Sequence, residues 1–339
     1  MMSQLYLLFN HGIVQAQERN GQWTLKENEF DKMELECMAL DPHNPDRIYV
    51  GTVKDGLWIS DDAGKHWKQA GAGIKETRVT AVAVSSIETK NGYGIIWAGT
   101  EPSMLYRSED GGETWSDCPA LLDLPSRTTW SFPPRPYTHH VRYIQPDVFD
   151  VERIFVGIEL GGVMRSMDKG QTWEDRKPGS QHDCHTLTMQ SFLKNRIYEA
   201  GGGGFAESLD GGQTWETKNE GLADYNYLFD IAVSANNSDI ILVSASHGPY
   251  NAYNASEANS ILARKEGDQP WQIVNDGLPD AQGTTVSSLA ASENEPGVFY
   301  SANNQGIYRS DDNGLHWRRI EMEWPEQYKQ GRVKKLLLR

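Results

Sequence analysis

The 339-residue sequence is poor in cysteine, has no long apolar segment and carries no excess of positive charge. Its three cysteines, Cys37, Cys118 and Cys184, are an odd number without CxxC or CxxH spacing, which favours a reduced compartment over a disulfide framework. No stretch approaches the roughly 18 apolar residues of a membrane span, so no membrane partner is expected. The net charge of -15 argues against nucleic acid or an anionic membrane surface as a partner.

The first residues also lack the features of a secretory signal peptide. Leu5 to Phe9 are apolar, but no basic segment precedes them, and His11 and Gly12 interrupt the run. Met1 to Gln17 are therefore expected to form a strand and a turn rather than a signal peptide. Together with the scattered cysteines, this predicts a cytoplasmic protein.

One short phrase, S-x-D-x-G-x-[TH]-W, recurs five times along the chain. The five copies run from Ser60 to Trp67, Ser108 to Trp115, Ser166 to Trp173, Ser208 to Trp215 and Ser310 to Trp317. Two worn copies keep the Trp and part of the turn, from Gln17 to Trp23 and from Lys265 to Trp271. Successive tryptophans of these copies are 42 to 58 residues apart, and the path from Trp317 through the C-terminus to Trp23 is 45 residues. The spacing predicts a chain that closes on itself after seven units.

The composition of the phrase indicates a tight turn between two strands. Its Asp side chain can accept hydrogen bonds from backbone N–H groups further along the chain. Its Trp would begin the next strand as a large apolar side chain whose indole N–H needs a partner. Positive φ is expected at the glycine of each copy, namely Gly64, Gly112, Gly170, Gly212 and Gly314. A catalytic group is needed once and not five times, so the aspartates of the copies are interpreted as scaffold.

This phrase is the Asp-box, or BNR repeat, and the chain resembles the BNR-type β-propellers. That group includes sialidases, other glycan-cleaving enzymes, sortilin-like receptors, a photosystem assembly factor and bacterial WD40/YVTN/BNR-like repeat proteins. The resemblance implies a propeller architecture and says less about chemistry. A typical sialidase is not expected, because the Arg-Ile-Pro phrase of that family is absent near the N-terminus.

We predict a single all-β domain over residues 1–339, a seven-bladed β-propeller with four-stranded blades. Closure of the ring removes the sheet edges that an open array of blades would expose. The first unit lacks an inner strand of its own. The tail from Arg332 to Arg339 is predicted to supply it, so that the C-terminal strand closes the N-terminal blade.

Candidate functional residues are sought on the face opposite the Asp-box turns, over the mouth of the central channel. Two long loops, Ser116 to His140 and the segment that begins at His247, carry aromatic and basic residues to this face. His140 and His185 are placed at the start of equivalent strands in adjacent blades, so their side chains are expected to converge. The predicted catalytic residues are His140, His185, Glu159 and Glu199. The predicted substrate-binding residues are Tyr137, His139, Arg142, His247, Tyr250, Glu101 and Trp130.

These residue types fit chemistry on a sugar. A histidine beside a carboxylate suits general acid–base catalysis, and an arginine such as Arg142 or Arg135 can hold a carboxylate through two hydrogen bonds. The run Gly201 to Gly204 leaves room for an approaching group, and it is not a phosphate loop because it lacks the Lys-Ser/Thr and the helix. A water-filled polar channel would, however, need hydrogen-bonding side chains without any catalysis. No spacing signature marks a metal site, so neither a metal nor another cofactor is predicted.

Two functions are consistent with these residues. The first is a carbohydrate-active propeller, a glycoside hydrolase or polysaccharide lyase, acting on an acidic or oligomeric sugar through the His/Glu/Tyr/Arg site. The second is a non-catalytic scaffold or assembly factor that binds a protein or peptide, because a fold does not imply a function. A small molecule or oligosaccharide is the expected ligand, and a protein partner stays open. The sequence carries no signal for an oligomeric state.

Overall fold

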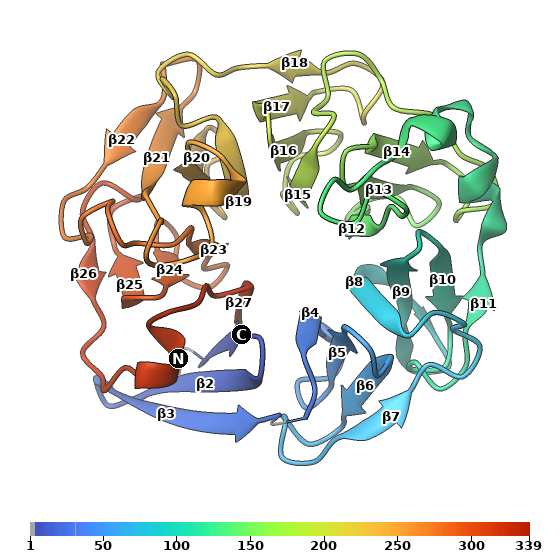
Figure 1. The fold of residues 1–339 in the computed structure, drawn as a ribbon, viewed down its shortest axis with the longest axis horizontal. Coiled ribbons are helices and arrows are strands. Elements are labelled where there is room, and N and C mark those ends of the chain that lie inside the picture. The colour runs from blue at the N-terminus through green and yellow to red at the C-terminus, as the bar shows by residue number, and fades with distance from the viewer. Residues whose placement is uncertain (1–3, 31) are drawn as a thin grey trace.

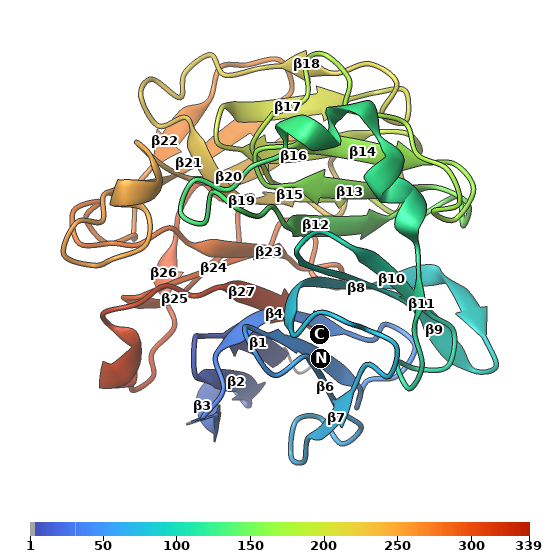
Figure 2. The ribbon, with the colours of Figure 1, turned by 45° about the vertical axis from the view of Figure 1, so that its right-hand side comes forward.

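The strands of the protein form seven antiparallel sheets arranged around a central channel in the computed structural model, which describes residues 4–30 and 32–339 (Figure 1). Each sheet runs from an inner strand at the channel to an outer strand at the rim, so the molecule is a seven-bladed β-propeller, as predicted (Figures 1 and 2). Because each blade is covered by its two neighbours, strands such as β13 are buried over their whole length. Of the predicted N-terminal strand and turn, the first three residues lie outside the described part of the chain.

The strands of each blade follow one another from the channel to the rim. The first three blades are β27(Lys335–Leu338), β1(Gln4–Leu8), β2(Gly12–Arg19) and β3(Gln22–Glu29); β4(Leu35–Leu40), β5(Ile48–Thr52), β6(Leu57–Ser60) and β7(Lys68–Ala70); and β8(Arg78–Lys90), β9(Tyr93–Glu101), β10(Leu105–Ser108) and β11(Ser116–Asp117). The fourth and fifth are β12(Val141–Pro146), β13(Ile154–Ile158) and β14(Gly162–Ser166); and β15(Cys184–Met189), β16(Ile197–Gly201), β17(Gly204–Ser208) and β18(Glu216–Thr217). The last two are β19(Tyr227–Val233), β20(Ile240–Ser246), β21(Ser260–Glu266) and β22(Gln272–Val274); and β23(Ser288–Ala291), β24(Phe299–Asn303), β25(Gly306–Ser310) and β26(Arg318–Arg319).

The C-terminal strand closes the ring in the predicted way. β27 pairs antiparallel with β1, with Leu336 opposite Leu7 and Leu338 opposite Leu5. Figure 1 shows both chain ends at this blade. The neighbouring inner strands contact one another all the way round, from β27 through β4, β8, β12, β15, β19 and β23 back to β27. The ring therefore leaves the innermost edges facing the channel rather than bulk solvent.

The repeated turns have the internal hydrogen bonds expected from their composition. In the copy at β17, Asp210 Oδ1 accepts hydrogen bonds from the Ser208 hydroxyl at 2.9 Å and from the Thr214 amide at 2.9 Å. The Ser208 hydroxyl in turn accepts the Gly212 amide at 2.8 Å. The glycine of each full copy has positive φ, between 79° and 91° at Gly64, Gly112, Gly170, Gly212 and Gly314. These hydrogen bonds thus stabilise the turn between the third and fourth strands of a blade.

In four copies of the phrase the tryptophan also joins its blade to the preceding one. Trp317 donates its backbone N–H to the Asp276 carbonyl of the blade before it at 3.0 Å. Gly277, which follows Asp276, has a φ of 77°. A Cβ at Gly277 would overlap the carbonyl oxygen of Trp317. The same close approach of a glycine to a tryptophan carbonyl occurs at Gly73, Gly179 and Gly221.

Two segments depart from a regular blade. The fourth sheet has three strands among the described residues, and an isolated bridge between Arg165 and Glu174 stands in place of its outer strand. The long loop before β12 is ordered by two 3-10 helices, η1(Pro119–Asp123) and η2(Pro125–Thr129), with Leu121 in the core. Further 3-10 helices are η3(Pro249–Asn251) and η4(Glu326–Tyr328).

Helices in the described part of the chain are all too short or too polar to cross a membrane. Cys37, Cys118 and Cys184 are free thiols.

Candidate functional site

A cavity of about 1100 Å³ lies at one mouth of the channel. It is lined by residues next to the starts of the inner strands and by the loops between second and third strands, such as His140, Glu159 and Tyr253. The repeated turns connect third and fourth strands and therefore lie at the opposite face. A second cavity, of about 640 Å³, lies deeper in the channel, and Glu36, Thr80, Arg142 and Lys334 line both.

A β-bulge recurs near the start of five inner strands and decides which side chains share a level of the channel. The pairing register skips one residue in β4, β8, β12, β15 and β19, and the skipped residues are Glu36, Thr80, Arg142, His185 and Phe229. A bulge redirects the side chain at that point. Two positions earlier stand Glu34, Arg78, His140, Asp183 and Tyr227, which all line the larger cavity.

This register corrects one expectation. His140 and His185 do not occupy equivalent positions, because His185 is the skipped residue of its strand and the equivalent residue of β12 is Arg142. The residue equivalent to His140 is Asp183. The channel mouth therefore combines one histidine, one arginine and one aspartate where the sequence alone suggested a pair of histidines.

Arginines and carboxylates alternate around the cavity. Arg135 holds Glu101 with two parallel hydrogen bonds, Nε to Oε1 at 2.6 Å and Nη2 to Oε2 at 2.5 Å. The other close pairs are Arg78 Nη2 with Glu36 Oε2 at 2.8 Å and Arg142 Nε with Glu159 Oε2 at 3.1 Å. Arg135 lines the cavity, whereas Glu101 does not. Glu101 contributes to the cavity wall by orienting Arg135.

Two cations of the wall have no carboxylate of their own. Among the described residues Arg332 forms no ion pair, and its Nη1 is buried without a hydrogen-bond partner. Its guanidinium lies 3.9 Å from the ring centroid of Tyr253. Lys334 donates to the Leu35 carbonyl at 2.6 Å, and burial lowers its pKa although Glu36 opposes the shift. The cavity wall therefore offers two cationic side chains that form no close ion pair among the described residues.

His140 is buried among these cations. Its Nε2 lies 3.6 Å from Glu159 Oε2, and its ring packs edge-on against Phe132 with 4.8 Å between the ring centroids. Burial, followed by Arg142 and Arg135, lowers the pKa of His140 well below its ordinary value of 6.5. The imidazole is therefore neutral near pH 7 and can accept a proton.

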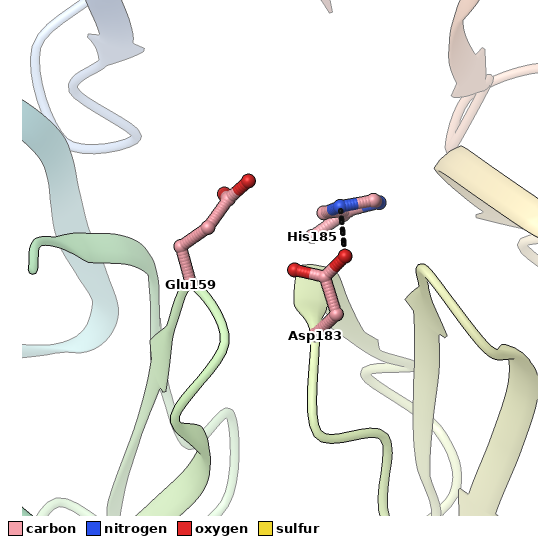
Figure 3. Close-up of side chains that lie close together, drawn as sticks. All are labelled: Glu159, Asp183 and His185. Carbon is pink, nitrogen blue, oxygen red and sulfur yellow. Dashed lines mark ion pairs between the residues drawn. The ribbon is translucent and has the colours of Figure 1, made fainter. Parts of the chain in front are cut away.

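Glu159, Asp183 and His185 converge from two adjacent blades (Figure 3). One ligand-type atom from each lies within 4.8 Å of the others, and His185 Nε2 is 3.4 Å from Asp183 Oδ2. Burial works against ionisation of Asp183, but His185, the Leu160 amide and Arg142 outweigh it and lower its pKa. A Cβ on Gly202 would overlap Asp183 Oδ2. The absence of a side chain at Gly202 thus leaves room for the carboxylate of Asp183.

Glu199 is the predicted catalytic residue that the structure does not bring to either cavity. It lies in the middle of β16, fully buried, where Glu199 Oε2 accepts the Gln181 amide at 2.9 Å. Burial raises its pKa to about 8. Glu159 reaches the larger cavity and Glu199 does not, because Glu159 follows the end of β13, whereas Glu199 is central in its strand.

The predicted binding residues divide into three groups. Arg142 lies in the cavity wall, and Glu101 holds Arg135, another residue of that wall. Trp130 and His139 are structural, since the Trp130 indole donates to the Ser126 hydroxyl at 2.9 Å and His139 Nδ1 bonds the Ser103 hydroxyl at 2.8 Å. The exposed residues outside the wall are Tyr137, Tyr250 and His247.

The prediction missed several residues of the wall. Arg78 begins the inner strand β8, and Asp183 precedes the inner strand β15 by one residue. His140 was predicted from the same kind of position, at the start of an inner strand. Arg332 lies in the closing tail, and Tyr227 and Tyr253 come from β19 and the loop after β20. The hydroxyl groups of these two tyrosines are 2.5 Å apart. Their position over the channel depends on ring closure and loop conformation, for which the sequence has no local pattern.

No protein-family model matches the chain. A curated relative, the oligoxyloglucan-reducing end-specific xyloglucanase of Emericella nidulans, is 23% identical over 153 residues. This similarity covers 41% of the chain but only 17% of the length of the relative.

Solved structures with the same architecture include an ancestral GH74 enzyme and the GH74 enzyme of Niastella koreensis, with TM-scores of 0.66 and 0.64 and 16% identity in both cases. The chain matches over 86% and 93% of its own length, which is 39% and 52% of theirs. YCF48 bound to D1 peptide has a TM-score of 0.54 and 16% identity, and 90% of this chain matches 92% of that one. At these identities the likeness shows the propeller fold alone.

Proposed function

We propose that the protein is a carbohydrate-active propeller that binds an acidic oligosaccharide in the larger cavity. The observation that carries this proposal is Arg332 beside Lys334 in that cavity, because the Arg332 Nη1 atom is buried without a hydrogen-bond partner. A buried donor without a partner is costly, and a carboxylate ligand would accept a hydrogen bond from it. The neighbouring Tyr253 and Tyr227 offer ring faces and hydroxyl groups to a sugar.

The relatives support the carbohydrate class. The similar curated protein is a xyloglucanase and two similar structures are GH74 enzymes, although the chain spans only part of each. We also assign the repeated turns to the Asp-box group, on the five copies of the phrase and their shared hydrogen bonds. Membership of the Asp-box group agrees with a protein that binds or cleaves glycans. It does not indicate which glycan is the substrate.

The geometry fits elimination better than hydrolysis. Hydrolysis needs a protonated carboxylic acid opposite a second carboxylate. Glu199 lies outside the cavity, and the lowered pKa of Asp183 makes it a poor acid. Elimination needs a neutral base to take the proton next to the sugar carboxylate and an acid to protonate the leaving oxygen. The electron pair of the broken C–H bond forms a C=C bond in one product, and the electron pair of the C–O bond leaves with the oxygen that the acid protonates.

His140 and the tyrosine pair fill these two roles. His140 is neutral near pH 7, as its pKa requires for a base. Burial, followed by Tyr253 and Glu159, raises the pKa of Tyr227, so Tyr227 keeps its proton and can donate it to the leaving oxygen. Arg332, Lys334 and Arg142 would hold the sugar carboxylate and stabilise the charge that develops on it.

Binding is tested first, by titrating purified protein with an oligogalacturonide and with a neutral xylo-oligosaccharide. We expect Arg332→Gln to weaken binding of the acidic sugar at least about tenfold, since a charge-assisted bond is lost. Arg19→Gln, at the exposed end of β2, serves as the matched control and leaves binding unchanged. Equal binding of both sugars, or equal loss in both variants, would contradict the proposal.

Turnover is then followed by the ultraviolet absorbance of the unsaturated product, in the wild type and in His140→Ala. Loss of turnover with binding retained supports His140 as the base. If binding occurs without turnover in the wild type, the cavity is a binding site only.

A peptide-binding scaffold is the second candidate, and one observation favours it. YCF48 bound to D1 peptide matches this chain over nearly the full length of both, as expected for two single propellers. An acidic peptide could neutralise Arg332 as well as a uronate can. Tighter binding of an acidic peptide than of every acidic oligosaccharide, lost in Arg332→Gln, would select this candidate.

A further inference from the structure

His185 is oriented by one hydrogen bond and leaves its second nitrogen unused. Its ring is 1% exposed, and its Nδ1 lies 2.6 Å from the Leu228 carbonyl oxygen. A carbonyl oxygen only accepts, so Nδ1 carries the hydrogen. In the neutral imidazole Nε2 is then a bare lone pair, and it is buried without a hydrogen-bond partner.

The groups that this lone pair faces are carboxylates. Asp183 Oδ2 is 3.4 Å from His185 Nε2, and an oxygen of Glu159 lies in the same cluster, within 4.8 Å of both. A lone pair and two carboxylates repel one another unless a positive charge lies between them. Glu159 shares one oxygen with Arg142, and a carboxylate has several acceptor directions left.

We infer that Glu159, Asp183 and His185 bind one divalent transition-metal ion, of the Zn²⁺ or Mn²⁺ class, at the base of the larger cavity. One imidazole nitrogen and two carboxylates are a donor set that suits these ions. The hydrogen bond from Nδ1 to a backbone carbonyl is the support that metal-bound histidines commonly have.

Binding of a metal ion would require only a small movement of the three ligand side chains. Metal–ligand bonds of about 2.1 Å place neighbouring ligand atoms of a tetrahedral ion about 3.4 Å apart. The Asp183–His185 pair already has this spacing, and Glu159, within 4.8 Å of both, needs to approach by at most about 1.4 Å. Glu159 is attached just after β13 and is only partly buried, so its side chain can move.

The site is open on one side. Glu159 and Asp183 both line the larger cavity, so three protein ligands leave a coordination position toward the ligand space. The ligands come from two adjacent blades, and the bulge in β15 brings His185 to the level of Glu159. This is why no ligand spacing is visible in the sequence.

The test is calorimetric titration of chelator-treated protein with Zn²⁺, and with Mn²⁺ followed by electron paramagnetic resonance. Titrations use a His316→Asn background, because exposed His316 beside Asp312 could bind metal adventitiously. We expect one equivalent of metal with saturable binding. His185→Asn keeps a donor for the Leu228 carbonyl and removes Nε2, and Glu159→Gln removes one oxygen ligand.

Each variant is expected to weaken binding at least about tenfold, because even loss of an outer partner of a metal ligand costs this much. Glu36→Gln, a carboxylate of the same cavity outside the cluster, is the control and should change affinity less than about threefold. Gly202→Ala, which keeps every ligand but crowds Asp183, should also weaken binding.

The inference is overturned by the absence of saturable binding, by equal affinities of His185→Asn and Glu36→Gln, or by nitrogen NMR showing a hydrogen on His185 Nε2 in metal-loaded protein. That last result would mean a protonated His185 paired with Asp183. Because the probe is the metal alone, failure of the sugar-binding experiment leaves this test intact.

Discussion

His140 is an imidazole placed among guanidinium groups, and its ionisation follows from that environment. Burial, Arg142 and Arg135 all disfavour the charged ring. Glu159, at 3.6 Å, is the nearest carboxylate and is already engaged by Arg142. The combination keeps a neutral imidazole in the wall of the larger cavity.

If His140 is the base of the proposed reaction, activity persists below its ordinary pKa. A lowered pKa means that the ring stays deprotonated as the pH falls below 6.5. We therefore expect the acid limb of the kcat/KM profile to lie below pH 6.5 and to vanish with the activity in His140→Ala. An acid limb at or above pH 6.5 would assign the base to another group.

Glu199 makes stability depend on pH. Its pKa is raised by burial from an ordinary 4.5 to about 8, so the folded state holds a proton that the unfolded state releases over this range. The stability it contributes is complete below pH 4.5 and is lost as the pH rises to 8. We expect Glu199→Gln to be more stable than the wild type at pH 9 and to differ less at pH 5, measured by urea denaturation. The same difference at both pH values would show that Glu199 does not ionise on unfolding.

Glycine and tryptophan join the elements of neighbouring blades. Each of Gly73, Gly179, Gly221 and Gly277 has positive φ and lies against the carbonyl of a tryptophan in the following blade. The repeated phrase therefore has two roles, an internal lock and a contact between blades. Only the internal hydrogen bonding of the turn can be predicted from its residue types.

The contact between blades is tested by Gly277→Ala. A Cβ there would overlap the Trp317 carbonyl oxygen, so we expect a loss of about 2–4 kcal/mol of unfolding free energy. Gly267→Ala is the matched control, because Gly267 also has positive φ but no atom within 4 Å of its Cβ position. The control should lose about 1 kcal/mol from backbone strain alone. Equal losses would show that the close approach is unimportant.

Closure by β27 connects the stability of the whole ring with the chemistry at its mouth. Leu336 is 1% exposed and packs in the cluster that contains Leu5, Leu7 and Val14. The same tail carries Arg332 and Lys334 into the cavity. One segment thus closes the first blade and supplies two cations of the cavity wall.

Leu336→Ala is expected to lower the unfolding free energy by about 2–5 kcal/mol, as for a leucine in a close-packed core. Leu338→Ala, a partly buried position on the same strand, should lose less. Both are compared by thermal and urea denaturation. If Leu336→Ala costs no more than Leu338→Ala, β27 does not seal the blade through its buried side chain.

The sequence alone determined the architecture, because the repeated turn is local. Serine, aspartate, glycine and tryptophan within eight residues contain their own hydrogen bonds, and their period counts the blades. The apolar tail without a partner unit likewise predicted closure by β27. For the site, residues at strand ends could be predicted as a class, and His140, Glu159, His185 and Arg142 were found in this way.

Tertiary structure decided which of these residues meet. A one-residue bulge in each of five inner strands shifts the register, so that His185 matches Arg142 and His140 matches Asp183. Glu199, two residues from the end of its strand, is buried between blades instead of reaching the cavity. Such positions depend on packing between segments far apart in the chain, and no short sequence pattern encodes that packing.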